Sequence, residues 1–478
     1  MENPLFSLWK QIGKKEKVVI AVDGSAYEYS DQELIILSDL KIFKQFDILY
    51  VTNREIENKD LNLKIHTPKI IRAGGKDEYE TRLYELGSEN LRGSGFRGEK
   101  LIETLSTELI ACLSIADFTV TKTKTSEIPY YINNRNSFYG KNPFSGTLSE
   151  CMSALRVWIN QLDDLDLGNG KIGFSKWMST SLAIHRLLPH FQRAWGAAIV
   201  SKEEEYPLGD GDVKEYLSSI FLRSQNLITT RDMLELLKFN SFDRFNKKQD
   251  RYSYYLNYYF GYFLLLLTGI FDAIDTISYW RIKNKNKKPI HISFRYKNKD
   301  SEKYIREISL INKDLGEFLG TEKIQSTLKF IYFFRNYIAH DILPGGVTYV
   351  GNFQGLSGDL LLLKGKLMEN IEDFAKHNEL ITKEQLLEVG IDNKPRVVGE
   401  KEVEKLFEPI LFSRYMVSHA MSIIDSIFKH LNLEQRLLSS QKEKEEFEKL
   451  RKLPRRTSYD EIFDKVDRAL AYVEASVP

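Results

Sequence analysis

The stretch Phe330–His340 reads FIYFFRNYIAH, and it places His340 five residues after Arg335, which Asn336 follows directly. At 100° per residue, apolar side chains in and before this stretch form one stripe. The stripe consists of Ile324, Leu328, Ile331, Phe334 and Ile338. Lys329, Asn336 and His340 cluster on the other side, within about 40° of one another. The spacing therefore predicts a helix over 322–341 with polar groups near its end.

Arg335 occupies an unusual position on this helix. It falls beside the apolar stripe, roughly 140° round from His340. Because a buried arginine without a partner is very costly, the position favours an ion pair, with Asp272 or Asp275 as candidate acids. Alternatively, the long side chain reaches round the helix to a shared phosphate, or a second subunit completes the site. The sequence leaves these interpretations open.

Arginine and histidine at this spacing suit RNA cleavage. A guanidinium can grip the scissile phosphate and stabilise the charge that develops there. An imidazole titrates near neutrality and can move protons at the attacking 2′-hydroxyl or the leaving oxygen. Asn336 can fix the histidine tautomer or donate to a phosphate oxygen.

The spacing alone is a weak signal. The chain has 8 histidines, and chance gives about one such match among its arginines. Arg414 and His419 repeat the spacing in another predicted helix, where a structural role is the simpler interpretation.

The context of the first pair resembles the HEPN ribonuclease family. Nuclease members of that family are α-helical bundles with Arg-(four to six residues)-His near the end of a helix, often with Asn after the arginine. Arg335, Asn336 and His340 match this motif, and Pro344, Gly345 and Gly346 would end the helix as in the family. The resemblance covers about 250–435 and implies a metal-independent endoribonuclease without a cofactor. It also implies a homodimer with a composite site, products ending in a cyclic 2′,3′-phosphate, and a role as a toxin or abortive-infection effector in antiviral defence, with an antitoxin or trigger partner.

Composition gives no bulk signal for nucleic acid. The 478 residues include 68 basic and 67 acidic side chains, a net charge of +1, so RNA binding must come from local patches. Candidate RNA-binding residues are Lys285, Lys287, Lys288 and Lys329. The length favours two or three domains.

Cysteine usage and hydropathy favour a soluble cytoplasmic protein. Cys112 and Cys151 are too few for a disulfide framework or a cysteine-based zinc cluster, and no metal site is expected. Residues 1–17 lack a signal-peptide core. The apolar run Tyr258–Phe271 spans about 14 residues, whereas a bilayer requires about 20, so it is expected to be a buried helix.

The fold is expected to be mainly α, with a small α/β domain at the N-terminus. In the α/β regulatory or sensor domain (1–140), strands are predicted over 18–23, 46–51, 69–72 and 118–123, and a helix over 98–113. A helical connecting region (141–249) contains predicted helical segments at 148–163, 175–200, 212–223 and 230–239. The HEPN-like bundle (250–435) contains predicted helices at 251–282, 303–319, 322–341 and 403–432, with β insertions at 286–297 and 345–368. A charged helical tail (436–478) starts its helix at Gln441.

Weaker motifs allow other functions. Gly93–Gly98 spells GxGxxG but lacks the strand that a dinucleotide site needs, so Arg92 and Arg97 are candidate anion-binding residues in a loop. Asp23 ends a strand, where a turn aspartate is the simpler reading than a metal ligand. The rival functions are a non-catalytic HEPN dimerisation or nucleotide-binding module, and a small-molecule sensor built on the Gly93–Gly98 loop.

Overall fold

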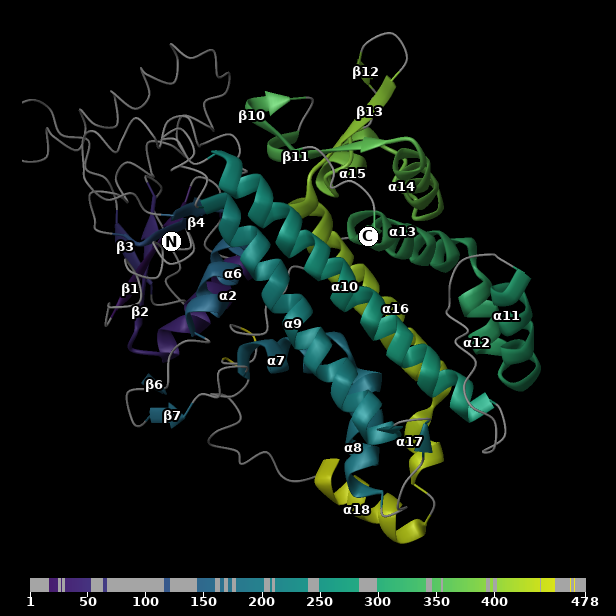
Figure 1. Cartoon of the computed structure of the whole chain (residues 1–478). Helices are drawn as coiled ribbons and strands as arrows, with labels where there is room; N and C mark the ends of the chain where they lie inside the picture. Colours follow the sequence, from purple (N-terminus) through teal and green to yellow (C-terminus); the bar gives the residue numbers. More distant parts are fainter. Residues whose placement is uncertain are drawn as a thin grey trace, which may run out of the picture.

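The computed structural model shows a mainly helical protein with a small parallel sheet near its N-terminus (Figure 1). The residues that it describes are 17–24, 27, 31–52, 63–66, 116–120, 144–159, 164–166, 171–173, 178–201, 207–208, 211–239, 249–282, 299–340, 346–353, 356–392, 396–398, 402–438, 440–451, 465 and 468. The mainly α prediction is therefore confirmed for the described part of the chain.

Five parallel strands form the N-terminal sheet, in the order β3-β2-β1-β4-β5. They are β1 (Val18–Asp23), β2 (Phe46–Val51), β3 (Lys64–His66), β4 (Phe118–Val120) and β5 (Phe144–Gly146). The predictions for β1 and β2 are confirmed, because continuous apolar runs of this length suit strands buried on both faces. The strand predicted over 69–72 and the helix predicted over 98–113 lie outside the described residues.

The sheet is joined directly to the helices. One face packs against α2 (Gln32–Asp39), which leads into η1 (Leu40–Ile42), and against α6 (Leu148–Ile159). Phe46 and Trp158 make an edge-to-face contact there, with ring centroids 5.5 Å apart. Thr147 alone separates β5 from α6, so the sheet extends to residue 146 and continues straight into the helical part.

The helices after α6 differ in detail from the predicted segments. The apolar segment at 175–200 is two helices, α7 (Met178–Leu187) and α8 (Pro189–Val200), because proline favours the first position of a new helix. The segments at 212–223 and 230–239 are one continuous helix, α9 (Val213–Phe239). Thr229 and Thr230 fit inside it because their hydroxyls donate to carbonyls four residues earlier. Two short hairpins, β6–β7 (Asp164–Asp166, Lys171–Gly173) and β8–β9 (Pro207–Leu208, Gly211–Asp212), flank these helices.

The long helices pack around an aromatic core. Helices α9 and α10 (Gln249–Ile282) lie side by side, and α13 (Glu322–His340) and α16 (Pro409–Leu431) pack against α10 (Figure 1). Neighbouring ring centroids in the core are 5.0–5.6 Å apart, at Phe260, Phe330, Phe334, Phe374, Phe407 and Phe412. Each such pair contributes about 0.5–1.5 kcal/mol beyond its buried area. This core fixes α13 against α10 and α16.

Two predicted helices in this region are wrong in their bounds. The helix at 303–319 breaks into α11 (Lys299–Ile311) and α12 (Lys313–Gly320), because Asn312 leaves the helical conformation and accepts a hydrogen bond from Leu315 N. The helix at 403–432 begins only at Pro409, since the alternating residues before it form β13 (Glu402–Phe407). Asn312 and Pro409 thus mark boundaries that apolar spacing alone did not reveal.

The insertion predicted over 345–368 is a β-hairpin of β10 (Gly346–Phe353) and β11 (Leu356–Lys364). With β13 and β12 (Arg396–Val398) it makes a four-stranded antiparallel sheet, in the order β10-β11-β13-β12. Helices α14 (Lys366–His377) and α15 (Lys383–Glu388) follow the hairpin and had no counterpart in the sequence analysis. The insertion at 286–297 lies outside the described residues.

The described tail is helical, with α17 (Leu433–Leu437) and α18 (Gln441–Arg451). The predicted start at Gln441 is confirmed. A Cβ added to Gly196 of α8 would lie 3.1 Å from the Phe447 ring, so α18 packs closely on α8.

In the described residues, Tyr255–Ser278 of α10 is the one segment long and apolar enough to cross a membrane. Its most apolar window has a mean hydropathy of 1.6, and 67% of that window is buried inside the protein. This burial is consistent with a core helix of a soluble protein, as the sequence predicted.

Candidate functional site

The predicted motif helix is α13, and it ends at His340 within one residue of the expected boundary. After exposed residues at its start, α13 is mostly buried from Ile324 to Phe334, and Arg335–Ile338 are half-exposed. The structure describes the backbone of His340, whereas its side chain lies outside the described set. Arg335 and Asn336 are therefore the motif residues whose contacts can be examined.

Arg335 and Asn336 contact each other at the start of the exposed turn. Arg335 Nη1 donates a hydrogen bond to Asn336 Oδ1 at 2.7 Å. Arg335 Nε is buried and has no hydrogen-bond partner within the described part of the chain. A buried donor without a partner costs about 1–3 kcal/mol of folding free energy, so this orientation of the guanidinium destabilises the fold.

The expected ion pair between Arg335 and Asp272 or Asp275 is not formed. The exposed Asp272 of α10 instead accepts a hydrogen bond from the Tyr332 hydroxyl at 2.6 Å. The same hydroxyl lies 3.3 Å from the Thr268 carbonyl oxygen. Tyr332, one turn before Arg335, thus binds the aspartate that was predicted to pair with the arginine.

Tyr332 was missed by sequence reasoning. It lies three residues before Arg335, a spacing that places both on neighbouring positions of one helix face. Its side chain is buried to 2% exposure, yet its hydroxyl reaches the exposed Asp272. The neighbouring rings pack in or against the core, so the aromatic-rich sequence gave no sign that the Tyr332 hydroxyl has a polar partner.

The other candidate RNA-binding and anion-binding residues divide into two groups. Lys329 pairs with Asp373 of α14 at 3.0 Å, and His377 lies 3.3 Å from the same carboxylate. Its charge is therefore compensated within the protein. The remaining candidates lie outside the described residues; these are Lys285, Lys287, Lys288, Arg92 and Arg97, and the Gly93–Gly98 loop lies outside them as well.

The second arginine–histidine pair is structural. Arg414 Nε and Nη2 donate to the two carboxylate oxygens of Glu235 at 2.7 and 2.8 Å. His419 stacks on Tyr415 and has Nε2 3.3 Å from the Thr327 hydroxyl. Burial lowers the pKa of His419 to about 4, and the positive charge of Lys323 acts in the same direction. A histidine that stays neutral and packed in this way is unsuited to proton transfer near neutral pH.

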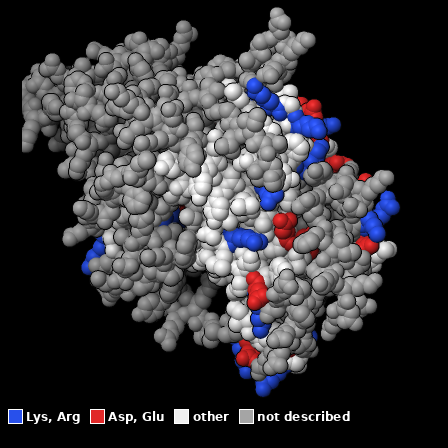
Figure 2. All heavy atoms as spheres, viewed as in Figure 1, with Lys and Arg blue, Asp and Glu red and all other residues white. Residues whose placement is uncertain are grey.

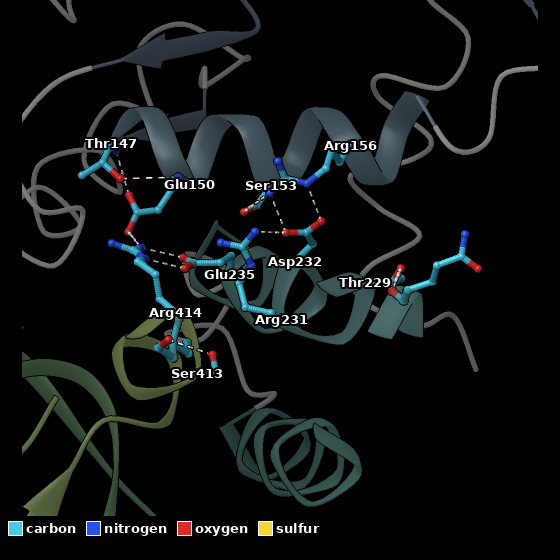
Figure 3. A network of polar contacts seen from close by, with 12 residues as sticks. Thr147, Glu150, Ser153, Arg156, Thr229, Arg231, Asp232, Glu235, Ser413 and Arg414 are labelled. Atoms are coloured by element: carbon cyan, nitrogen blue, oxygen red, sulfur yellow. Dashed lines mark hydrogen bonds and ion pairs between the residues drawn. The ribbon is translucent and has the colours of Figure 1, made fainter. Parts of the chain in front are cut away.

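Arg414 belongs to a buried charge network between α6, α9 and α16 (Figure 3). Arg156 Nε and Nη2 bind Asp232 at 2.8 and 2.9 Å. Arg231 Nη2 also lies 2.9 Å from Asp232, and burial lowers the pKa of Arg231 while the Asp232 charge opposes that shift. The network links α6, the helix after the sheet, to α9 and α16.

Sequence reasoning missed this network because its members are far apart along the chain. It contains three guanidinium groups and three carboxylates, from Arg156, Arg231, Arg414, Glu150, Asp232 and Glu235. The one available signal was the charged group at 231–235 inside an otherwise apolar helical segment. Such buried charges need partners, although the sequence does not name them.

Asp23 lies at the carboxyl end of β1 and is fully buried. Gly24 follows it and donates to the Val51 carbonyl oxygen, and a Cβ at Gly24 would lie 2.5 Å from that oxygen. Only glycine fits this turn.

The strand order reverses between β1 and β4, and open parallel sheets bind ligands outside the carboxyl ends of strands at such a point.

Within the described ranges, no group of three or more His, Cys, Asp or Glu side chains lies close enough to hold a metal ion. His190, for instance, contacts a single acid, with Nδ1 2.7 Å from Asp425 Oδ2. In comparisons with known proteins, no family model, curated protein or solved structure matches the chain.

Proposed function

We propose that this chain is a metal-independent endoribonuclease of the HEPN type, with Arg335, Asn336 and His340 in its active site. The observation that carries the proposal is the condition of Arg335. Its guanidinium is oriented by an amide, has no carboxylate partner among the described residues and keeps a buried Nε without a hydrogen bond. Such a group is suited to an anion supplied from outside the chain, and a phosphate diester has the matching geometry.

The proposed reaction is transesterification within the RNA strand. The 2′-hydroxyl oxygen attacks the adjacent phosphorus, and the bond from phosphorus to the 5′-oxygen breaks. His340 accepts the proton of the 2′-hydroxyl or donates a proton to the departing 5′-oxygen. Arg335 stabilises the negative charge on the non-bridging oxygens, and Asn336 holds the guanidinium in place. The products carry a cyclic 2′,3′-phosphate and a 5′-hydroxyl.

A homodimer extends this scheme, because a composite site contains two histidines, one to accept and one to donate the proton. Uncontrolled RNA cleavage in the cytoplasm harms the host cell, which fits a toxin or abortive-infection effector. Such an enzyme needs restraint, from an antitoxin or from its own N-terminal domain. The buried carboxylate at the carboxyl edge of the parallel sheet supports a sensor role for that domain.

The test compares wild type with the His340→Ala variant on total RNA and tRNA, with EDTA present throughout. The proposal expects cleavage by wild type alone and products with cyclic phosphate ends. The rival, a non-catalytic module in which these residues stabilise the bundle, expects no cleavage by either protein. It also expects His340→Ala to lower stability by about 1–3 kcal/mol, since a buried partner would lose its hydrogen bond.

A further inference from the structure

Helix α10 exposes one narrow strip on an otherwise buried surface. Tyr258, Tyr262 and Leu265 are 58%, 39% and 48% exposed, although their neighbours on the helix are mostly buried. Their spacing of four and three residues places them on one side of the helix, and Gly269 and Asp272 continue the series. Figure 2 shows mostly uncharged surface where α9 and α10 lie in Figure 1, with separate basic and acidic groups on it and beside it.

Arg223 of α9 reaches across to this strip. Its Nη1 donates to the Gly269 carbonyl oxygen, and its guanidinium carbon would lie 3.3 Å from a Cβ at Gly269. The absent side chain of Gly269 therefore provides the room for the guanidinium. Arg223 is half-buried and has no ion pair with a carboxylate in the described portion of the protein.

The motif helix contacts α10 at two points beside the strip. The Tyr332 hydroxyl lies against the Thr268 carbonyl, next to Gly269, and a Cβ at Gly261 would lie 3.1 Å from Ile338. Arg335 follows Tyr332 by about 4.5 Å of helix rise and precedes Ile338 by the same amount. Arg335 thus projects from the segment of α13 that crosses α10 between these two contacts.

We infer that this α10 strip, formed by Tyr258, Tyr262, Leu265 and Arg223, binds single-stranded RNA and leads it to Arg335. Guanidinium groups bind successive phosphates, and exposed tyrosine rings stack on bases without sequence preference. The inference rests on the proposed function. Among the described residues, the guanidinium groups of Arg223 and Arg335 have no carboxylate partner. This favours a polyanion over a second copy of the chain, because a second copy would present the same positive charges. The one carboxylate on the strip, Asp272, is already bound by Tyr332.

The experiment measures fluorescence anisotropy of a labelled single-stranded RNA of about 12 nucleotides. The protein is the full chain carrying His340→Ala, so that the probe stays intact. Tyr262→Ala is expected to weaken binding at least about fivefold, whereas Tyr262→Phe, which keeps the ring, is expected to bind as before. Arg223→Ala is expected to weaken binding and to lower the salt dependence of the affinity by about 0.7 in slope. Arg306→Ala, an exposed arginine of α11, is the charge-matched control and is expected to bind normally.

In the active enzyme, Tyr262→Ala and Arg223→Ala are expected to raise KM with little change in kcat, since they act on binding. Weakened RNA binding by these variants, with no cleavage by wild type, would support RNA binding by the strip and contradict the proposed function. Cleavage by wild type, with unchanged RNA affinity in both variants, would contradict RNA binding by the strip and leave the proposed function intact. Absence of RNA binding by the intact protein would also overturn it. A loss of dimer in Tyr262→Ala, measured by light scattering, would assign this face to a second copy instead.

Discussion

The chain contains two arginine–histidine pairs with the same five-residue spacing, and the structure gives them opposite surroundings. On α16, Arg414 is bound by Glu235 and Glu150, and His419 is packed between Tyr415 and Thr327. On α13, the one partner of Arg335 in the described part of the chain is the Asn336 amide, and Arg335 lies in a half-exposed turn. The spacing is identical, so the difference lies in which charges face each arginine.

This difference gives a criterion that separates a structural arginine from one that can bind an external anion. A structural arginine is neutralised by the fold, as in the buried network of Figure 3. Under the proposed function, an arginine that binds an external anion is instead oriented without being neutralised. Asn336 achieves this for Arg335, because an amide oxygen accepts a hydrogen bond without carrying a charge.

The largest effect is expected at Arg414. Replacing it by methionine removes the guanidinium bound to the buried carboxylate of Glu235 and should lower the free energy of unfolding by about 3–5 kcal/mol. Urea unfolding followed by circular dichroism measures this change. A loss below about 1 kcal/mol would contradict the structural assignment of this pair.

Arg335→Met is the matched change in the other pair. Because no carboxylate of the described chain depends on this guanidinium, the free energy of unfolding should fall by no more than about 1 kcal/mol. RNA cleavage should fall by about 10²–10³-fold, the usual consequence of removing a group that stabilises transition-state charge. Equal losses of stability in Arg335→Met and Arg414→Met would abolish the distinction between the pairs.

The fold was predictable where one local rule decided the outcome. The continuous apolar runs of β1 and β2 and the end of α13 at His340 matched the sequence analysis. The helix predicted over 303–319 failed because Asn312 adopts a capping conformation, a choice that the apolar pattern does not record. Helices α14 and α15 were missed because the Gly-rich turns around them concealed their short apolar repeats.

The site was predictable in its residues and less so in its contacts. The motif supplied Arg335 and Asn336, whose hydrogen bond is local. The partner of Asp272 was not predictable, since Tyr332 competes with Arg335 for it only once α13 crosses α10. The partners of Arg414 lie 179 and 264 residues away in the chain, beyond the reach of any spacing rule.

The pH dependence of stability should distinguish the two histidines further. The pKa of His419 is lowered to about 4 from its ordinary 6.5, so the unfolded chain takes up a proton that the folded chain refuses. Its contribution is present above pH 6.5 and is lost as the pH falls toward 4, by at most about 3 kcal/mol. The melting temperature should fall more from pH 7 to pH 5 in wild type than in His419→Gln. Identical divergence in both proteins would show that His419 is not held in its neutral form.

The smallest effect is expected at Lys329, which shares a helix with the motif. Its ion pair with Asp373 is partly exposed, so Lys329→Ala should lower the free energy of unfolding by less than about 1 kcal/mol. Because Asp373 compensates the charge, RNA cleavage should also change little. A large fall in cleavage rate, measured beside Arg335→Met, would extend the active site along α13 to this lysine.

The decisive measurement for the proposed active site is cleavage of total RNA by wild type and His340→Ala in EDTA, with analysis of the product ends. Wild type should leave cyclic 2′,3′-phosphate and 5′-hydroxyl ends, and the variant should cleave at least about 10²-fold more slowly. The variant should melt at the wild-type temperature. Equal cleavage by both proteins, or cleavage abolished by EDTA, would contradict a metal-independent site at Arg335 and His340.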